Sequence, residues 1–147
     1  MSEKMRVHSS PAYASSTSLA IESTEVMSIA KIEVLGKIVA SGLVAVIRAE
    51  NPDQAARIAE ACSLAGVGAL EITFTVPEAN RVIERLAKQF FSQILLGAGT
   101  VLDPETAHIA ILAGAQFVVS SAPSPESARL CNRYPIPTCP ALEQFAK

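Results

Sequence analysis

The stretch Gly66-Val-Gly-Ala-Leu-Glu-Ile-Thr-Phe-Thr-Val-Pro-Glu-Ala79 decides the fold of this chain, because it places one carboxylate, that of Glu71, inside an otherwise apolar strand. Side chains alternate along a strand, so the stretch has two faces. One face is bulky and apolar: Leu70, Ile72 and Phe74. The other is small and mostly polar: Ala69, Glu71, Thr73 and Thr75. The first face suits a covering helix, and the second suits the inside of a barrel or a cleft.

A carboxylate in a buried parallel strand needs a physical reason, because such strands normally read as unbroken apolar runs. Two alternatives to a functional site exist for Glu71. It could belong to a buried ion pair at a strand end, or lie on the solvated face of an antiparallel strand. The spacing alone favours these alternatives, and the choice therefore depends on what stands at the ends of the other strands.

The composition indicates one globular domain with enough apolar material for a core, since 50% of the 147 residues are hydrophobic. Basic residues are scattered and aromatic residues are few, which argues against a nucleic-acid partner. No apolar run approaches the ~20 residues of a membrane-spanning helix. Cys62, Cys131 and Cys139 match no metal-ligand pattern, so we expect small buried side chains, no metal and a cytoplasmic protein.

Residues 1–28 differ from the rest of the chain. They are rich in serine and threonine, show no apolar periodicity, and resemble neither a signal peptide nor a transit peptide. We predict a disordered tail over 1–28 and a folded domain over 29–147.

From residue 29 onward, helical and strand-like patterns alternate. A helix is expected over 29–41, and prolines at positions 52, 77, 104 and 125 are expected to open four more. Between them lie apolar runs of strand length, at 43–48, 69–74, 94–98, 116–120 and, more weakly, 136–139. Strands and helices that alternate over short connections predict an α/β fold with a parallel sheet and right-handed crossovers.

Polar residues gather where these strands end, and the carboxyl ends of parallel strands share one edge of a sheet. They are Arg48, Glu71 with Thr73 and Thr75, the Gly97-Ala-Gly-Thr100 turn, and Ser120. Arg48 could bind a carboxylate or phosphate, or form a salt bridge with Glu71 or Asp53. The glycines could admit a ligand to the backbone or permit tight packing. His108 is expected on a helix, as a packing or surface residue.

Five segments, in order and at matching spacing, resemble the 2-dehydro-3-deoxy-phosphogluconate (KDPG) and 4-hydroxy-2-oxoglutarate (KHG) aldolase family. They are Val44-Ala-Val-Ile-Arg48, Leu70-Glu-Ile-Thr-Phe-Thr-Val-Pro77, Gly97-Ala-Gly-Thr-Val101, Gly114-Ala-Gln-Phe-Val-Val-Ser120 and Cys131-Asn-Arg-Tyr-Pro-Ile-Pro137.

The resemblance implies a class I aldolase on a (β/α)8 TIM barrel, usually a homotrimer, that needs no cofactor or metal. Such enzymes cleave a sugar-acid phosphate or another 2-keto acid to pyruvate and an aldehyde, through a lysine Schiff base. Glu71 matches the family glutamate that shuttles protons, Thr100 a residue at the pyruvyl group, and Arg48 an arginine at the substrate anion. Thr73, Gly99 and Ser120 are expected at the substrate as well. Thr75 stands where some members have arginine and others threonine.

Two departures from the family pattern affect this expectation. Ser120-Ser-Ala-Pro123 replaces a Ser-Pro-Gly motif, and no segment matches the sixth strand, which carries the Schiff-base lysine. A closed barrel takes at least about 200 residues, so we expect a partial barrel of about five βα units that is inactive by itself. The alternatives are a non-enzymatic half-barrel that pairs with itself or with full-length subunits, and an open sheet that binds a phosphorylated ligand at Gly97–Thr100.

Overall fold

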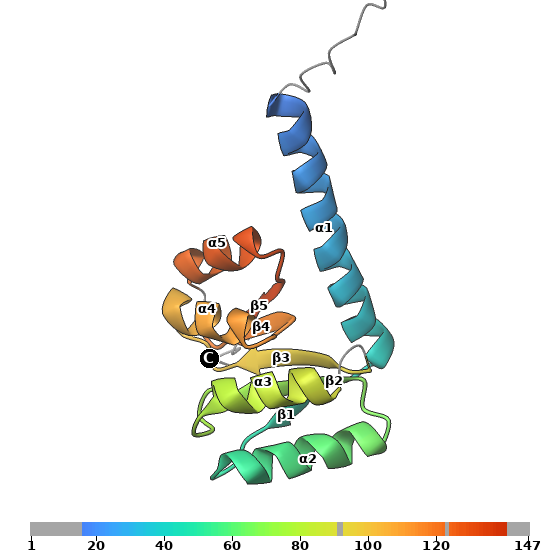
Figure 1. The fold of residues 1–147 in the computed structure, drawn as a ribbon, viewed down its shortest axis with the longest axis vertical. Coiled ribbons are helices and arrows are strands. Elements are labelled where there is room, and N and C mark those ends of the chain that lie inside the picture. The colour runs from blue at the N-terminus through green and yellow to red at the C-terminus, as the bar shows by residue number, and fades with distance from the viewer. Residues whose placement is uncertain (1–15, 91–92, 123, 141–147) are drawn as a thin grey trace, which may run out of the picture.

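The computed structural model describes residues 16–90, 93–122 and 124–140, with side chains from residue 29 onward. Its helices and strands alternate along the chain (Figure 1). In order they are α1 (Ser16–Ser41), β1 (Ala45–Ile47), α2 (Pro52–Leu64), β2 (Ala69–Thr73), α3 (Ala79–Gln89), β3 (Leu95–Gly99), α4 (Pro104–Leu112), β4 (Phe117–Ser120), α5 (Pro125–Arg133) and β5 (Thr138–Pro140).

The strands form one sheet in the order β1-β2-β3-β4-β5, and every neighbouring pair is parallel. The predicted α/β fold with parallel strands is therefore confirmed. Each connection between strands contains a helix, as parallel neighbours require. Within the described ranges, β1 and β5 each pair with a single strand, so the sheet has two free edges there.

Three of the predicted helix starts are confirmed by their capping geometry. The side chains of Asn51, Asp103 and Ser124 each accept a hydrogen bond from the backbone amide three residues further on, at 2.9, 2.6 and 3.2 Å. A proline follows each cap, where its missing N–H costs nothing. The helix expected at Pro77 starts differently. Its cap is Glu78, which has a φ of 54° and forms no side-chain capping bond, and α3 begins at Ala79.

The helix α1 begins earlier than we predicted. We expected disorder over 1–28, but residues 16–28 are helical and continuous with the expected helix over 29–41. Neither proline nor glycine interrupts the sequence between position 12 and position 35, so nothing in it breaks the helix backbone. Residues 1–15 of the expected tail lie outside the described residues, and the domain boundary at residue 28 stays a prediction.

The sheet has two faces with different coverings. The outer face packs against α2 to α5 and forms the larger core, which contains Leu70, Ile72, Leu96, Ala98 and Val118. The inner face carries the alternate residues. At the amino ends of the strands it is apolar, with Ala69, Leu95 and Phe117 covered by Val34 and Ile38 of α1. At the carboxyl ends it becomes polar, as the alternation along residues 69–75 predicted.

Candidate active site

The candidate site lies on the inner face, where β2 and β3 end. Glu71 is paired in register with Gly97, and Thr73 with Gly99. The Glu71 side chain extends along the inner face and lies over Gly99. A β-carbon added at Gly99 would lie 1.7 Å from Oε1 of Glu71. The absence of a side chain at position 99 therefore creates the space that the carboxylate occupies.

Glu71 is a buried acid, with 7% of its surface exposed. Burial raises the pKa of the Glu71 carboxyl above its ordinary value, because a low-dielectric environment disfavours the charged form, and the nearby Arg48 charge partly opposes this shift. No described residue donates a hydrogen bond to the carboxylate. A raised pKa in a carboxyl without structural partners is typical of a group that exchanges protons.

Glu71→Gln should stabilise the fold at neutral pH by roughly 1 kcal/mol. A group whose pKa is raised on folding contributes stability that is complete below the unfolded-state pKa and is lost as the pH rises through the folded-state pKa. The neutral amide avoids this loss, so the two proteins should converge in acid, below a pH of about 4. Urea unfolding across this range measures the effect, with the exposed Glu50→Gln as control. A Gln variant that is less stable at neutral pH would show that Glu71 holds the fold together.

Arg48 follows β1 directly and shares the inner face with Val46, which pairs with Glu71. Of the alternatives that the sequence left open, neither salt bridge forms. Within the described residues no ion pair joins Arg48 to Glu71 or to Asp53, and Asp53 instead pairs with Arg85 at 3.4 Å. Arg48 nevertheless lies near enough for its charge to act on Glu71. Its exposed guanidinium is therefore available to an anion.

The two threonines of β2 and the following turn have different environments. Thr73 is fully buried, and its hydroxyl donates to the carbonyl oxygen of Ile47 at 3.2 Å. The exposed Thr75 hydroxyl lies 2.7 Å from that of Thr73. These bonds join the ends of β1 and β2 next to Arg48. Thr73 thus has a structural role beside the expected one, and contact of either threonine with substrate stays a prediction.

The Gly97–Thr100 segment fits the inner face for two reasons. A β-carbon at Gly97 would lie 2.3 Å from the Phe117 ring, so this glycine permits tight packing. Gly99 instead makes room for Glu71. Thr100 has a φ of 58°, in the left-handed region that favours glycine, and such conformations cluster at functional sites. Tight packing, one of the two alternatives that the sequence left open, therefore applies at Gly97. Access of a ligand to the backbone of this segment stays a prediction.

Ser120 is the expected site residue that the structure does not bring to the others. Side chains alternate along β4, so Ser120 lies on the same side of the strand as Val118, which belongs to the outer-face core, and on the opposite side from Val119. Its hydroxyl accepts a hydrogen bond from the amide of Ala122 at 3.3 Å, within the turn after β4. Contact with substrate through Ser120 stays a prediction, whereas its role in this turn is a direct observation.

The sequence analysis missed Cys139 as a residue of the inner face. It pairs with Val119 in register, and Val119 packs on the inner-face cluster. Cys139 is half-buried, and burial raises the pKa of its thiol, as does the charge of Glu71. The alternation of Thr138 and Cys139 could have revealed this position, had the register of β5 been known.

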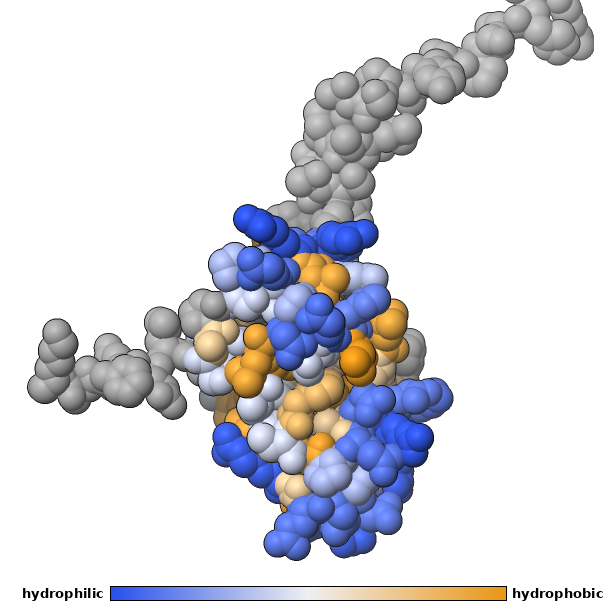
Figure 2. All heavy atoms as spheres, turned by 90° about the vertical axis from the view of Figure 1, so that its left-hand side faces the viewer, coloured by the Kyte–Doolittle hydropathy of each residue, from blue (hydrophilic) through white to orange (hydrophobic). Residues whose placement is uncertain are grey.

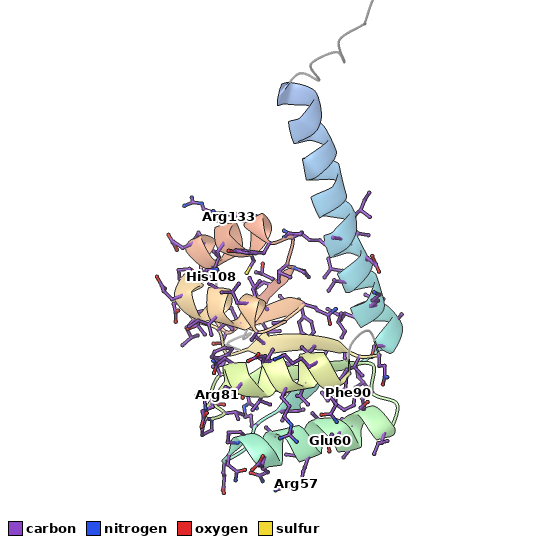
Figure 3. The ribbon with its side chains drawn as sticks, in the orientation of Figure 1. Arg57, Glu60, Arg81, Phe90, His108 and Arg133 are labelled. Atoms are coloured by element: carbon purple, nitrogen blue, oxygen red, sulfur yellow. The ribbon has the colours of Figure 1, made fainter. Side chains whose placement is uncertain are left out.

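Other features of the molecule lie away from this site. A cavity of about 430 Å³ lies at the amino ends of the strands, between Lys37, Phe90 and Gln116 among others. Figure 3 places Phe90 at the end of α3 and His108 on α4, both on the helical layer. His108 lies 2.8 Å from the Tyr134 hydroxyl through its Nε2, which agrees with the expected packing role. Exposed apolar side chains appear among charged ones in Figure 2.

Two further searches cover only the described part of the chain. Within residues 16–90, 93–122 and 124–140, no helix is both long and apolar enough to cross a membrane. Over the same ranges, no three His, Cys, Asp or Glu side chains are grouped so that they could hold a metal ion.

The strands are all parallel, alternate with helices and pair in their sequence order β1-β2-β3-β4-β5, which is the arrangement of a (β/α) barrel, and a buried acid and an exposed arginine lie at their carboxyl ends. The family described as KDPG and KHG aldolase matches residues 34–147. The chain belongs to this aldolase family, as the five segments predicted.

Two curated relatives show how much of the family fold the chain covers. The 2-dehydro-3-deoxy-phosphogluconate aldolase of Treponema pallidum is 35% identical over 100 residues, which are 68% of this chain and 47% of the relative. The 2-dehydro-3-deoxy-6-phosphogalactonate aldolase of Escherichia coli is 32% identical over 98 residues, 67% of this chain and 48% of the relative. The chain therefore spans about half the length of these relatives.

A solved structure agrees with them. The KDPG aldolase of Legionella pneumophila, with pyruvate captured as a covalent carbinolamine intermediate, has a TM-score of 0.60 and 33% identity. The match covers 66% of this chain and 47% of that one. The predicted partial barrel is confirmed by this likeness.

Proposed function

We propose that this chain carries the proton-transfer part of a class I aldolase site that acts on 2-keto acids. The substrate class is 2-dehydro-3-deoxy-6-phosphogluconate or 4-hydroxy-2-oxoglutarate, each of which yields pyruvate and an aldehyde. The observation that carries the proposal is Glu71, a buried carboxyl with a raised pKa at the carboxyl end of β2. A proton shuttle needs such a pKa, because it must both accept and return a proton near neutral pH.

In this proposal the residues around Glu71 bind the substrate. Arg48 contacts its carboxylate through paired donors, and Thr100 and Thr75 contact the pyruvyl portion. Gly99 leaves the space in which Glu71 and the substrate meet. Membership of the family and the neighbour that captured pyruvate support these assignments. A homotrimeric assembly, which the family resemblance implies, belongs to the same proposal.

The covalent step needs a lysine on a strand, and the lysines of the described ranges lie on helices. Lys31 and Lys37 belong to α1, and Lys88 to α3. We therefore propose that a polypeptide of these 147 residues binds 2-keto acids but does not cleave them.

Pyruvate should bind the purified chain saturably, while borohydride should trap no pyruvate adduct on any lysine. Arg48→Ala should weaken binding about tenfold, since it removes a charged hydrogen-bond partner. Arg57→Ala on α2 is the matched control, because it removes an exposed arginine of the helical layer (Figure 3). Calorimetric titration and mass spectrometry after reduction give the two readouts. A trapped lysine adduct would overturn the proposed division of the site, and absent pyruvate binding would overturn the function itself.

A half-barrel that pairs with itself or with full-length subunits is the second candidate. Its support is the exposed apolar surface of α1, formed by Ile29, Ile32, Leu35 and Val39. The size of the same purified protein distinguishes the candidates: a monodisperse oligomer without affinity for pyruvate would favour the second.

A further inference from the structure

The hydroxyl groups of Thr73 and Thr75 are hydrogen-bonded in one direction only. Thr73 is 0% exposed, and its hydroxyl lies 3.2 Å from the carbonyl oxygen of Ile47. A carbonyl oxygen only accepts, so Thr73 donates its single proton to Ile47. Thr75 is therefore the donor of the 2.7 Å bond between the two threonines. The reverse direction would take this donor away from the Ile47 carbonyl beside a side chain that solvent does not reach, which is costly.

Thr75 consequently presents only an acceptor to its surroundings. A hydroxyl has one proton and two acceptor lone pairs, and Thr75 uses its proton in the bond to Thr73. The Thr75 side chain is exposed, and among the residues that the structure describes no second hydrogen bond occupies its oxygen. This oxygen can bind a donor, such as a hydroxyl group of a ligand. An ionised carboxylate or a keto oxygen gains nothing from it, because both groups only accept.

This acceptor lies beside the arginine of the proposed site. The Thr73 hydroxyl joins the end of β2 to Ile47, and Arg48 is the next residue of the chain. Glu71 and Thr73 are two residues apart in β2, so their side chains lie on the same face of the sheet. A small molecule whose carboxylate contacts Arg48 is therefore held next to the acceptor-only oxygen of Thr75.

The two proposed substrates share one group that matches this acceptor. In 2-dehydro-3-deoxy-6-phosphogluconate and in 4-hydroxy-2-oxoglutarate, the carboxylate at C1 and the keto oxygen at C2 are acceptors, and C3 carries only hydrogen. The hydroxyl at C4 is the one donor that both molecules have, and pyruvate lacks it. Matching of donor to acceptor therefore places the C4 hydroxyl at Thr75.

We propose that Thr75 is a specificity-determining residue that accepts a hydrogen bond from the C4 hydroxyl of a 4-hydroxy-2-keto acid. Thr73 is the positioning residue that keeps the Thr75 proton turned away from the ligand. This inference rests on the proposed function, because it uses the same substrate class and the same arginine. It refines that function at Thr75, which contacts C4 of the substrate rather than the pyruvyl portion.

Calorimetric titration of the full chain with three ligands tests the preference. They are 4-hydroxy-2-oxoglutarate, 2-oxoglutarate, which lacks the hydroxyl, and 4-fluoro-2-oxoglutarate, whose small fluorine cannot donate. The enantiomers of the two chiral ligands are titrated separately, and the tighter of each is compared. We expect the hydroxy acid to bind about fivefold more tightly than either of the others, the usual effect of one hydrogen bond.

Variants at the two threonines separate specificity from structure. In the nearly isosteric Thr75→Val the preference for the hydroxy acid should vanish and the affinity for 2-oxoglutarate should stay unchanged, whereas Thr75→Ser should keep the preference. In Thr73→Val the Thr75 proton is free to turn outward, so the fluoro acid should bind about as well as the hydroxy acid. Thr138→Val is the matched control, because Thr138 is exposed on β5, at the other edge of the sheet from β1. It should leave all three affinities unchanged.

The outcomes separate this inference from the proposed function. If pyruvate binds but the three ligands bind equally, or if the preference persists in Thr75→Val, the role of Thr75 is overturned and the proposed function stands. If neither pyruvate nor any of the three ligands binds, while the chain unfolds cooperatively on heating, both are overturned. A folded Thr73→Val that still prefers the hydroxy acid to the fluoro acid overturns the role of Thr73. A preference lost in Thr75→Val and kept in Thr75→Ser supports the role of Thr75, even where Thr73→Val fails to fold.

Discussion

Gly97→Ala should destabilise the fold by about 3 kcal/mol, at the upper end of the usual cost of overpacking. The new β-carbon would lie 2.3 Å from two atoms of the Phe117 ring. That ring is 1% exposed and packs in the inner-face cluster beneath α1, so it cannot move aside without displacing Leu95 or the helix. Urea unfolding followed by circular dichroism measures the loss.

A smaller residue at position 117 should rescue this variant. Phe117→Leu removes the ring atoms that the β-carbon would meet, so Gly97→Ala should cost less in that background, with a coupling of about 1–2 kcal/mol. Gly36→Ala is the matched control, because a β-carbon there meets nothing within 4 Å and α1 is helical. It should be neutral or stabilising by up to about 1 kcal/mol. Equal costs in both backgrounds would show that the Phe117 contact is not the cause.

Gly99→Ala should displace Glu71 and weaken pyruvate binding. The added β-carbon would lie 1.7 Å from Oε1 and 2.4 Å from Cδ of Glu71, so the carboxylate must leave its position. We expect a stability cost of about 1–3 kcal/mol. Pyruvate binding should weaken roughly tenfold or more, since an error of 1 Å in a site has effects of this size or larger. Calorimetry gives the affinity and urea unfolding the stability.

The same change in a Glu71→Ala background separates this contact from other effects. Without the Glu71 side chain beyond its β-carbon, the three nearest atoms are gone, and the stability cost of Gly99→Ala should fall markedly. A cost that persists would indicate that the backbone of β3 itself rejects a side chain at position 99. In that case, the missing side chain at Gly99 would not be the reason that Glu71 lies where it does.

Most of the fold could be predicted, because its signals are local. An Asn, Asp or Ser followed by proline gave three helix starts, and each is confirmed by a capping bond. Apolar runs gave five strands, confirmed within a few residues at their ends. The alternation along 69–75 gave the two faces of β2. Each of these patterns involves residues that are close together in the chain, so it can be recognised from the sequence alone.

The remainder depends on contacts between distant segments. The start of α1 was missed, because weak apolar periodicity suggested disorder where the backbone can simply continue as a helix. Ser120 was expected at the site as a polar strand-end residue; alternation along β4 puts it on the same side of the strand as Val118 of the outer-face core, and its contact with substrate stays a prediction. Cys139 was interpreted as a buried hydrophobe, because the register of a short strand cannot be seen in its own sequence.

The sequence by itself determined the alternation of strands and helices, the family, and the acid at position 71. Only the tertiary structure decided that Glu71 lies over Gly99, that Phe117 lies over Gly97, and that Cys139 shares the inner face. The physical reason is that capping and alternation are properties of neighbouring residues. The pairing register of strands, and the space that a missing side chain leaves, exist only once residues far apart in the chain have packed together.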